Sequence, residues 1–425
     1  MVGGPVAPRS RTLCLLGALA SLTLAVGLHA GTSAEWPCFH GPRRDNKSTE
    51  TGLLKQWPEE GPALLWSASG LGKGYSSASV AGGLLYTAGM VEQQTGVVAL
   101  GLDGKEKWRA PNGQAWAPTM SHATGYGGAR STPTWDDGVV YHLSERGRLI
   151  ALEAQSGKEV WHLDLLKEFE GEMPKYGFAE SVLILGDRLI CCPGGAKGYM
   201  ACLDKKTGKT VWTNTEVQGT LGYCSPVLAD IAGTRQVLNM SAKVVFGVDI
   251  VTGKLLWSVE HGNERENSAT DPVVHEGHVY ASAGYGKGSI LVRLDPVQGG
   301  VEAKTVWRSK LLDNHHGGVL LVGEHLYGAG HQAEGWFCLD FLTGRQAWKA
   351  SGKGSLTYAD GMLYCLDERG TMTLVEATPK EHRAVSSFRL PKGGAGLYWA
   401  HPVVCGGRLY VRHADALFAY DIRAR

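Results

Sequence analysis

Eight side chains spread along the sequence are of types that bind small molecules: two fixed cations, two carboxylates, two imidazoles, an amide and an indole. They are Arg130, Glu180, Asp271, Asn314, His316, Lys353, Trp399 and His401. Cations bind the anionic groups of a ligand, an indole stacks on a flat ring, and a carboxylate can accept a proton from an alcohol. These groups would form a ligand site if the fold brings them together, although buried opposite charges could also simply pair with each other.

The candidates occupy similar places in a repeated pattern, in which a proline stands eight residues before a tyrosine. The pairs are Pro133 and Tyr141, Pro272 and Tyr280, and Pro402 and Tyr410. Other repeats keep the spacing with Val, Leu or Ala in place of the proline. Most candidates stand one to three residues before this slot, where other repeats have Ser, Gly or Ala. Further residues stand at or beside the same positions, namely Tyr75, Tyr223 and His315.

A second pattern ends each repeat with a glycine turn, a basic residue, two further residues and a tryptophan. It reads LDGKEKW at Trp108, EAQSGKEVW at Trp161, LDKKTGKTVW at Trp212, VDIVTGKLLW at Trp257 and LDFLTGRQAW at Trp348, with degenerate copies at Trp307 and Phe388. Glycine supplies the positive φ that a tight hairpin needs. The intervals between these aromatic residues, about 40 to 53 residues, are typical of propeller blades.

Each repeat is predicted to form four short antiparallel strands. Eight repeats can be counted, but the last, which starts at Trp399, stops before its tryptophan strand. The missing strand is available at Pro62–Ser67, which contains Trp66. We therefore predict an all-β fold: an eight-bladed β-propeller of four-stranded antiparallel blades over residues 62–425, its ring closed by an N-terminal strand that pairs with the last blade. The tryptophans are expected at the rim and the proline strands at the axis.

The N-terminal residues predict export. Arg9 and Arg11 precede an uncharged apolar run, and small residues follow it, so residues 1–34 are predicted to be a signal peptide. Residues 35–61 are then an N-terminal extension, and the mature protein is expected in a periplasm or outside the cell. No later stretch has the ~20 apolar residues of a transmembrane helix. The 42 basic and 41 acidic residues also argue against a nucleic-acid partner.

The tryptophan-ended repeat resembles that of the quinoprotein alcohol dehydrogenase-like propellers, the pyrroloquinoline quinone (PQQ) repeat. Five good copies cover most of the chain, and WPCFHGPRRD (36–45) looks like the start of uncharacterised secreted members of this group. The group includes PQQ-dependent dehydrogenases and also cofactor-free members, such as the BamB scaffold of outer-membrane assembly. The resemblance is therefore specific for fold and much less so for chemistry.

For the dehydrogenase members, the resemblance implies a quinone and Ca²⁺ in the axial site. By residue type, the quinone would be bound by Arg130, Lys353 and Trp399. The oxygen ligands that Ca²⁺ needs would come from Glu180, Asp271 and Asn314. Such enzymes stack a vicinal disulfide on the quinone, but Cys191 and Cys192 fall in the second strand of a repeat, where thiols of the core are expected.

Two functions follow from these observations. The favoured one is an exported propeller that acts as a scaffold for a small-molecule ligand in the central channel or for a protein partner. The alternative is a PQQ- and Ca²⁺-dependent alcohol or sugar dehydrogenase. The sequence assigns no cofactor and no metal site by itself, since the adjacent His315 and His316 would point to opposite faces of a strand.

Overall fold

The computed structural model describes residues 1–4, 34–118, 125–263 and 265–424. The chain divides into two units, Met1–Ser33 and Ala34–Arg425, and the fold is that of the second. Most of the predicted signal peptide, residues 5–33, lies outside the described residues. No helix in the described part of the chain has the length and apolar character needed to cross a bilayer.

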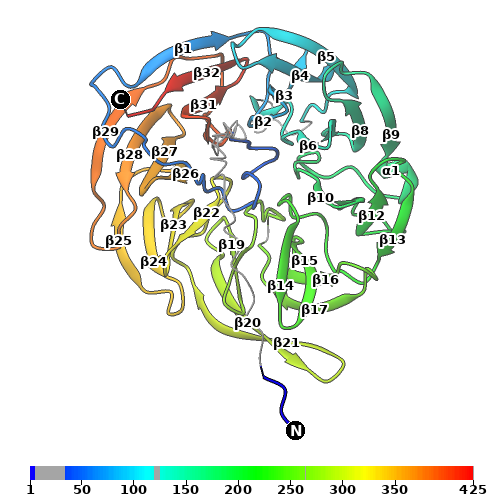
Figure 1. Cartoon of the computed structure of the whole chain (residues 1–425). Helices are drawn as coiled ribbons and strands as arrows, with labels where there is room; N and C mark the ends of the chain where they lie inside the picture. Colours follow the sequence, from blue (N-terminus) through cyan, green and yellow to red (C-terminus); the bar gives the residue numbers. More distant parts are fainter. Residues whose placement is uncertain (5–33, 119–124, 264, 425) are drawn as a thin grey trace. The chain divides into compact units, whose positions relative to one another are not determined.

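Eight four-stranded antiparallel sheets form a ring, the predicted eight-bladed β-propeller (Figure 1). Blades 1 to 4 comprise β2 (Ser79–Ala81), β3 (Leu84–Val91), β4 (Gln94–Gly101) and β5 (Glu106–Gln114); β6 (Thr134–Asp136), β7 (Val139–Leu143), β8 (Arg148–Glu153) and β9 (Glu159–Asp164); β10 (Leu183–Leu185), β11 (Arg188–Cys191), β12 (Met200–Asp204) and β13 (Thr210–Asn214); and β14 (Val227–Ile231), β15 (Thr234–Met240), β16 (Val244–Asp249) and β17 (Leu255–Glu260). The helix α1 (Leu165–Glu168) follows blade 2.

Blades 5 to 7 repeat the same meander. They comprise β18 (Val273–His275), β19 (His278–Ala283), β20 (Gly288–Val297) and β21 (Gly300–Ser309); β22 (Val319–Val322), β23 (His325–Gly330), β24 (Gly335–Asp340) and β25 (Gln346–Ala350); and β26 (Gly354–Ala359), β27 (Met362–Asp367), β28 (Thr371–Glu376) and β29 (Ala384–Arg389). Two-residue loops such as Asp137–Gly138, both at positive φ, join innermost to second strands, as expected for type I′ hairpins.

Blade 8 closes the ring with strands from both ends of the chain. It comprises β30 (Val403–Cys405), β31 (Arg408–His413), β32 (Ala416–Asp421) and, outermost, β1 (Ala63–Ala68). Trp66 of β1 lies opposite Ala419 of β32, in the place that the tryptophan takes in other blades. The predicted closure is confirmed, and β1 gives blade 8 the fourth strand that its own repeat lacks.

The tryptophans that end the repeats lie in the outermost strands, as predicted, and most of them join their blade to the next one. Trp257 differs, because its indole N–H donates to Gln236 Oε1 of its own blade at 2.6 Å. Trp212 of blade 3 lies against Gly253 of blade 4, and its indole N–H donates to the Ile250 carbonyl at 3.1 Å. Gly253 has a φ of +75°, and a Cβ there would lie 2.5 Å from the Trp212 ring. The same tryptophan–glycine joint recurs at Trp66 with Gly104, Trp108 with Gly157, Trp161 with Gly208, and Trp307 with Gly344.

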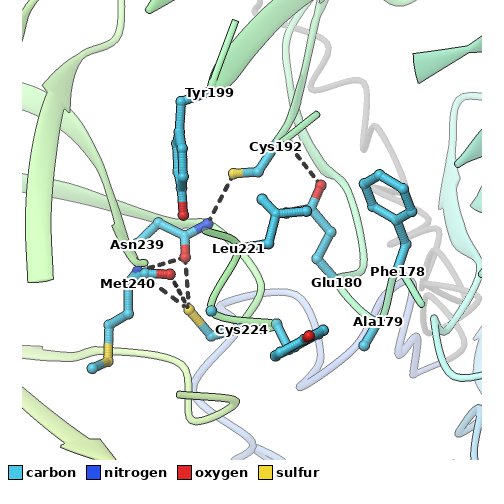
Figure 2. Close-up of a pocket in the computed structure, with 11 residues that line it drawn as sticks. Phe178, Ala179, Glu180, Cys192, Tyr199, Leu221, Cys224, Asn239 and Met240 are labelled. Atoms are coloured by element: carbon cyan, nitrogen blue, oxygen red, sulfur yellow. Dashed lines mark hydrogen bonds between the residues drawn. The ribbon is translucent and has the colours of Figure 1, made fainter. Parts of the chain in front are cut away.

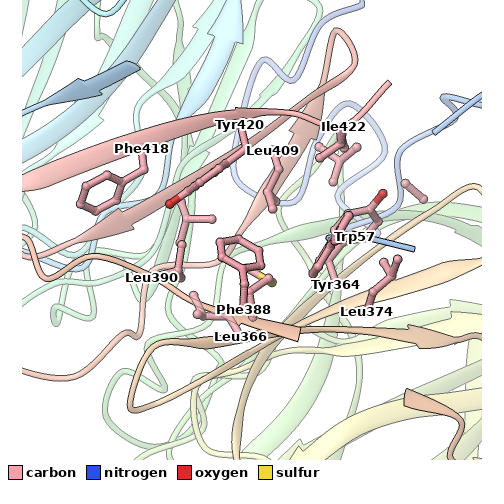
Figure 3. Packing of buried hydrophobic residues seen from close by; sticks show 14 of the residues in the cluster. Trp57, Tyr364, Leu366, Leu374, Phe388, Leu390, Leu409, Phe418, Tyr420 and Ile422 are labelled. Atoms are coloured by element: carbon pink, nitrogen blue, oxygen red, sulfur yellow. The ribbon is translucent and has the colours of Figure 1, made fainter. Parts of the chain in front are cut away.

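The joint between blades 7 and 8 is different, because Phe388 stands in the tryptophan slot. Trp57, from the N-terminal extension, packs edge-on against Phe388 at 5.2 Å and lies 5.8 Å from Tyr364 (Figure 3). Gly61 lies against the Phe388 ring as the turn glycines do elsewhere. The extension therefore supplies to this joint the aromatic ring and the glycine that the repeat lacks.

Residues 34–54, here called the strap, cross the centre of the ring (Figure 1). Their first contacts are with blades 1 and 2: Trp36 and Val80 exchange backbone hydrogen bonds of 2.7 and 2.8 Å, and the Pro37 carbonyl accepts the Trp135 N–H. The guanidinium of Arg44 then donates to carbonyls at the start of blades 3 and 4, those of Ser181 and Pro226, both at 3.1 Å.

The strap reaches the remaining blades by ionic and hydrogen-bond contacts. They join His40 to Asp271 before blade 5, Lys47 to the Leu321 carbonyl of blade 6, Ser48 to the Tyr358 carbonyl of blade 7, and the Glu50 carboxylate to the Gly406 and Gly407 amides of blade 8. One segment of about 20 residues thus contacts all eight blades. The sequence identified it only as an extension.

Two glycines of blade 4 allow the stability that the tryptophan joint contributes to be measured apart from the general cost of a side chain at positive φ. Gly233 and Gly253 have φ values of +71° and +75°, but a Cβ on Gly233 meets no atom within 4 Å. We expect Gly233→Ala to cost about 1 kcal/mol of unfolding free energy, and Gly253→Ala to cost about 1 to 3 kcal/mol more because it displaces Trp212. Thermal melts of the two variants measure the difference. Equal melting temperatures would show that the joint does not carry stability.

Candidate functional site

A pocket of about 540 Å³ lies where the chain enters the innermost strands. Six of the eight candidate residues line it: Arg130, Asp271, His316, Lys353, Trp399 and His401. Each precedes the innermost strand of its blade, so the meander repeated around the ring carries all of them to one face. Their neighbours in the repeat pattern also line the pocket, namely Tyr75, Tyr223 and His315.

Asn314 does not line this pocket, because its side chain is engaged in the core. The Asn314 Oδ1 accepts from the Thr270 hydroxyl at 2.7 Å and from the Gly318 N–H at 3.1 Å. Its Nδ2 donates to the carbonyls of Gly318 and Ala329 at 3.1 and 2.8 Å. Every polar atom of this amide therefore already has a partner, and its function is to hold the entry to blade 6.

Glu180 lies in a separate small cleft beside the main pocket (Figure 2). Its Oε1 accepts the Cys192 N–H at 2.6 Å, and the side chain is buried. Burial raises the pKa of Glu180 to about 7, although its hydrogen bond to Cys192 and the nearby Arg44 favour the carboxylate.

Cys192 also lines this cleft, but Cys191 does not. Both are buried free thiols, and they pack into different hydrophobic clusters on opposite sides of β11. The amide of Asn239 lies between two thiols, donating to Cys192 Sγ at 3.2 Å and accepting from Cys224 Sγ at 2.6 Å (Figure 2). Burial raises the pKa of all three thiols well above the ordinary value, so they are poor nucleophiles.

Arg130 brings a buried positive charge to the main pocket. Its Nη2 donates to the Tyr126 carbonyl at 2.7 Å, and its guanidinium lies over the rings of Tyr75 and Trp116 at 5.6 and 5.4 Å. No described carboxylate lies within 4 Å of it, and its buried Nε has no hydrogen-bond partner in the described part of the chain. Burial lowers the pKa of Arg130. An anion in the pocket would supply the missing partner.

The second cation of the pocket is paired. The Lys353 Nζ lies 3.1 Å from Glu368 Oε1, which also accepts the Trp399 indole N–H at 2.8 Å. Two rings pack against Trp399: Tyr126 stacks parallel to it at 5.1 Å, and His316 lies 4.8 Å away at 36°. The indole is therefore held in place as a wall of the pocket.

The histidines of the pocket are uncharged. Burial lowers the pKa of His315 and His401 to about 3 and that of His316 well below its ordinary value. The His315 Nε2 lies 3.3 Å from the Tyr285 hydroxyl. The fixed charge of the pocket is thus set by arginine, lysine and carboxylates. Among the described residues, no group of three His, Cys, Asp or Glu side chains could hold a metal ion.

The sequence analysis missed two groups of lining residues. Tyr285, His331 and Glu368 come from loops between second and third strands, which open on the same face as the entries to the blades. All three stand just after the second strand of their blade, and this shared position could have identified them from the sequence. Phe39 comes from the strap, and its ring stacks on His40 at 3.8 Å. Nothing in the repeat pattern places the strap in the channel.

The chain is similar to known proteins of two kinds. The family described as outer membrane protein assembly factor BamB matches residues 93–350. Quinohemoprotein alcohol dehydrogenase ADH IIB of Pseudomonas putida is 29% identical over 161 residues, which are 34% of this chain and 21% of the relative. BamB of Nitrosomonas eutropha is 27% identical over 178 residues, 40% of this chain and 37% of the relative. The matched regions therefore span well under two thirds of these relatives.

Solved structures show the same fold. The crystal structure of BamB from Moraxella catarrhalis has a TM-score of 0.58 at 17% identity and covers 85% of this chain and 98% of its own. That of quinohemoprotein alcohol dehydrogenase from Comamonas testosteroni has a TM-score of 0.62 at 14% identity and covers 92% and 80%. At these identities the likeness concerns the fold alone.

The raised pKa of Glu180 predicts a pH-dependent stability. Between pH 4.5 and about 7, the unfolded chain loses the Glu180 proton while the folded chain keeps it, so the unfolding free energy falls as the pH rises. We expect Glu180→Gln, which keeps the acceptor for Cys192, to remove a fall on the order of 3 kcal/mol. Urea denaturation at pH 5 and pH 8 measures it. The exposed Glu276→Gln is the control, and an unchanged pH slope in Glu180→Gln would contradict the prediction.

Proposed function

The chain belongs to the family of outer membrane protein assembly factor BamB, a branch of the PQQ-repeat propellers, and from this premise we propose that it is a ligand-binding scaffold. The ligand is a small anion, bound in the axial pocket. The scaffold role follows the BamB relatives, and protein partners would bind the same rigid ring. We further propose that residues 1–34 direct export, which places the scaffold in a periplasm or outside the cell.

The observation that carries the anionic ligand is Arg130, which has no carboxylate within 4 Å among the described residues and only a longer-range interaction with the buried Glu145. A buried guanidinium without a carboxylate is costly, and a ligand carboxylate or phosphate would satisfy its unpaired Nε. The tyrosines around it, Tyr75, Tyr126 and Tyr223, offer apolar ring surface and hydroxyl groups. A pocket that combines aromatic walls with a few polar groups is typical of small-molecule sites.

The quinoprotein dehydrogenase alternative rests on the names of the relatives, such as quinohemoprotein alcohol dehydrogenase. The residues that resemblance assigned to PQQ and Ca²⁺ do not fit those groups. The Asn314 amide has no free atom, and Glu180 lies in a different cleft from the rest of the set. Asp271 alone of the three proposed oxygen ligands lines the pocket. These positions support binding without quinone chemistry.

Titration with defined anions tests the proposal. The probes are benzoate, inorganic phosphate, and PQQ with Ca²⁺, and the signal is the tryptophan fluorescence of the purified protein. We expect saturable binding of at least one probe, weakened at least about tenfold in Arg130→Met because a charged hydrogen bond is lost. Arg109→Met is the matched control, since Arg109 is an exposed arginine paired with Glu106.

Three results would contradict the proposal. The first is the absence of saturable binding for every probe at millimolar concentration. The second is binding that Arg130→Met leaves unchanged, which would place the ligand elsewhere. The third is alcohol-dependent dye reduction by the protein loaded with PQQ and Ca²⁺, which would establish the dehydrogenase instead.

A further inference from the structure

A chain of three polar side chains joins the strap to the floor of the axial pocket. Asp271 Oδ2 lies 3.2 Å from His40 Nδ1, and His40 Nε2 lies 2.9 Å from His401 Nδ1. His401 Nε2 lies 2.7 Å from the His316 carbonyl oxygen. His40, Asp271 and His401 are at most 7% exposed, so water does not compete for these contacts.

The carbonyl at the end of the chain determines where the protons lie. A carbonyl oxygen only accepts, so His401 Nε2 must carry a proton and donate it. His401 is neutral, because burial keeps its pKa at about 3, and its Nδ1 is therefore an acceptor. His40 Nε2 must then carry the proton between the two rings. The remaining nitrogen, His40 Nδ1, faces a carboxylate oxygen that can only accept unless it is itself protonated.

One further proton on either His40 Nδ1 or Asp271 Oδ2 would remove the repulsion between these two acceptors, which lie 3.2 Å apart. We propose that His40 holds it as an imidazolium, so that His40 and Asp271 form a buried ionic latch that fixes the strap and thereby completes the ligand site. The latch is a feature of the strap itself. Only its consequence for ligand binding rests on the proposed function.

Three observations place the proton on His40 and not on Asp271. A free imidazole holds a proton more tightly than a free carboxylate. Asp271 Oδ1 accepts the Ser225 N–H at 2.7 Å, which favours the ionised carboxylate. The contact at Oδ2 is ionic in character, since Oδ2 has no well-aligned hydrogen-bond donor in the described part of the chain.

The charged groups near the latch come from every element packed around it. On the strap itself these are the Arg44 guanidinium and the Cys38 thiol. Arg44 interacts electrostatically with Glu180, and Cys38 interacts electrostatically with both Arg44 and Asp271. From the ring, the Glu180 carboxylic acid also interacts with Asp271.

The latch positions Phe39, the strap residue that lines the pocket. The Phe39 ring stacks on His40 at 3.8 Å and lies 5.0 Å from His401. A Cβ on Gly318 would lie 3.2 Å from His401 and 3.6 Å from His40, so the two imidazoles also fit closely against this turn. Release of His40 would withdraw Phe39 and open the floor of the pocket toward the channel. Phe39 is thus a specificity-determining residue, and His40 and Asp271 are its positioning residues.

The protonation state of His40 is measured by NMR on the full chain labelled with ¹⁵N-histidine at pH 7.5. We expect both nitrogens of His40 to be protonated, whereas His401 shows the neutral tautomer protonated at Nε2. In Asp271→Asn, His40 should lose its second proton. A neutral His40 in the unmodified protein would overturn the proposal, and this result does not depend on any ligand.

Thiol trapping measures whether the latch holds the strap. Cys38 is a buried strap residue, whereas Cys365 is buried in β27 of blade 7, one strand removed from the strand that the strap contacts. We expect 4,4′-dithiodipyridine to modify Cys38 at least about tenfold faster in Asp271→Asn and in His40→Gln, with Cys365 unchanged, as read by peptide mass spectrometry. Asp295→Asn is the control, because it breaks ion pairs with Arg293 and Lys304 in the outer strands of blade 5.

The outcomes separate the latch from the ligand proposal. Unchanged Cys38 reactivity in both latch variants overturns the latch, whatever anions bind. Faster modification of both cysteines also overturns it, because it shows general unfolding and not release of the strap. Selective modification of Cys38 supports the latch even if no anionic probe binds, and Phe39→Ala then tests its consequence, with weaker binding of any probe that saturates the pocket expected.

Discussion

The seating of a tryptophan ring on a glycine of the next blade is the contact on which the ring depends. A blade buries its second and third strands between neighbours, but its outermost strand is half exposed and cannot define the angle to the next blade by burial alone. The indole N–H bonded to a neighbouring carbonyl, with the ring against a turn that lacks Cβ, defines that angle repeatedly. Because the joints set the closure of the circle, they also set the distance across the axis at which polar side chains meet.

The strap crosses the central channel and contributes to the lining of the pocket. The residues before the innermost strands would by themselves bring Arg130, Lys353 and Trp399 to the mouth of an open central channel. The strap places Phe39 and His40 across that channel. Its contacts with all eight blades are made largely by single side chains and backbone groups, among them Arg44 to carbonyls and Glu50 to amides. Such contacts also satisfy groups on the inner strands that would otherwise have no partner in the ring.

The repeat made most of the fold predictable, because blade spacing, turn glycines and the missing last strand are all local patterns. It also brought six of the eight candidates to one pocket, since each stands at the same place in its blade. Asn314 and Glu180 could not be separated from them in this way, because residue type does not show that an amide is saturated by Thr270 and Ala329 or that a carboxyl group turns toward Cys192. The strap has neither alternation nor repeat, and its role depends on long-range contacts that only the closed ring creates.

The N-terminal location of both the strap and β1 has a consequence for biogenesis. A ribosome releases these residues first, yet their partners in blade 8 are the last to be made, with β1 pairing to β32 and Leu54 to Ile422. Trp36 and Pro37 can pair with blades 1 and 2 early, whereas β1 and Leu54 stay without their partners until blade 8 has been made. A chain truncated near its C-terminus would lose the pairing of β1 with β32. Its ring would stay open and expose apolar strand surfaces, which makes it a target for proteases.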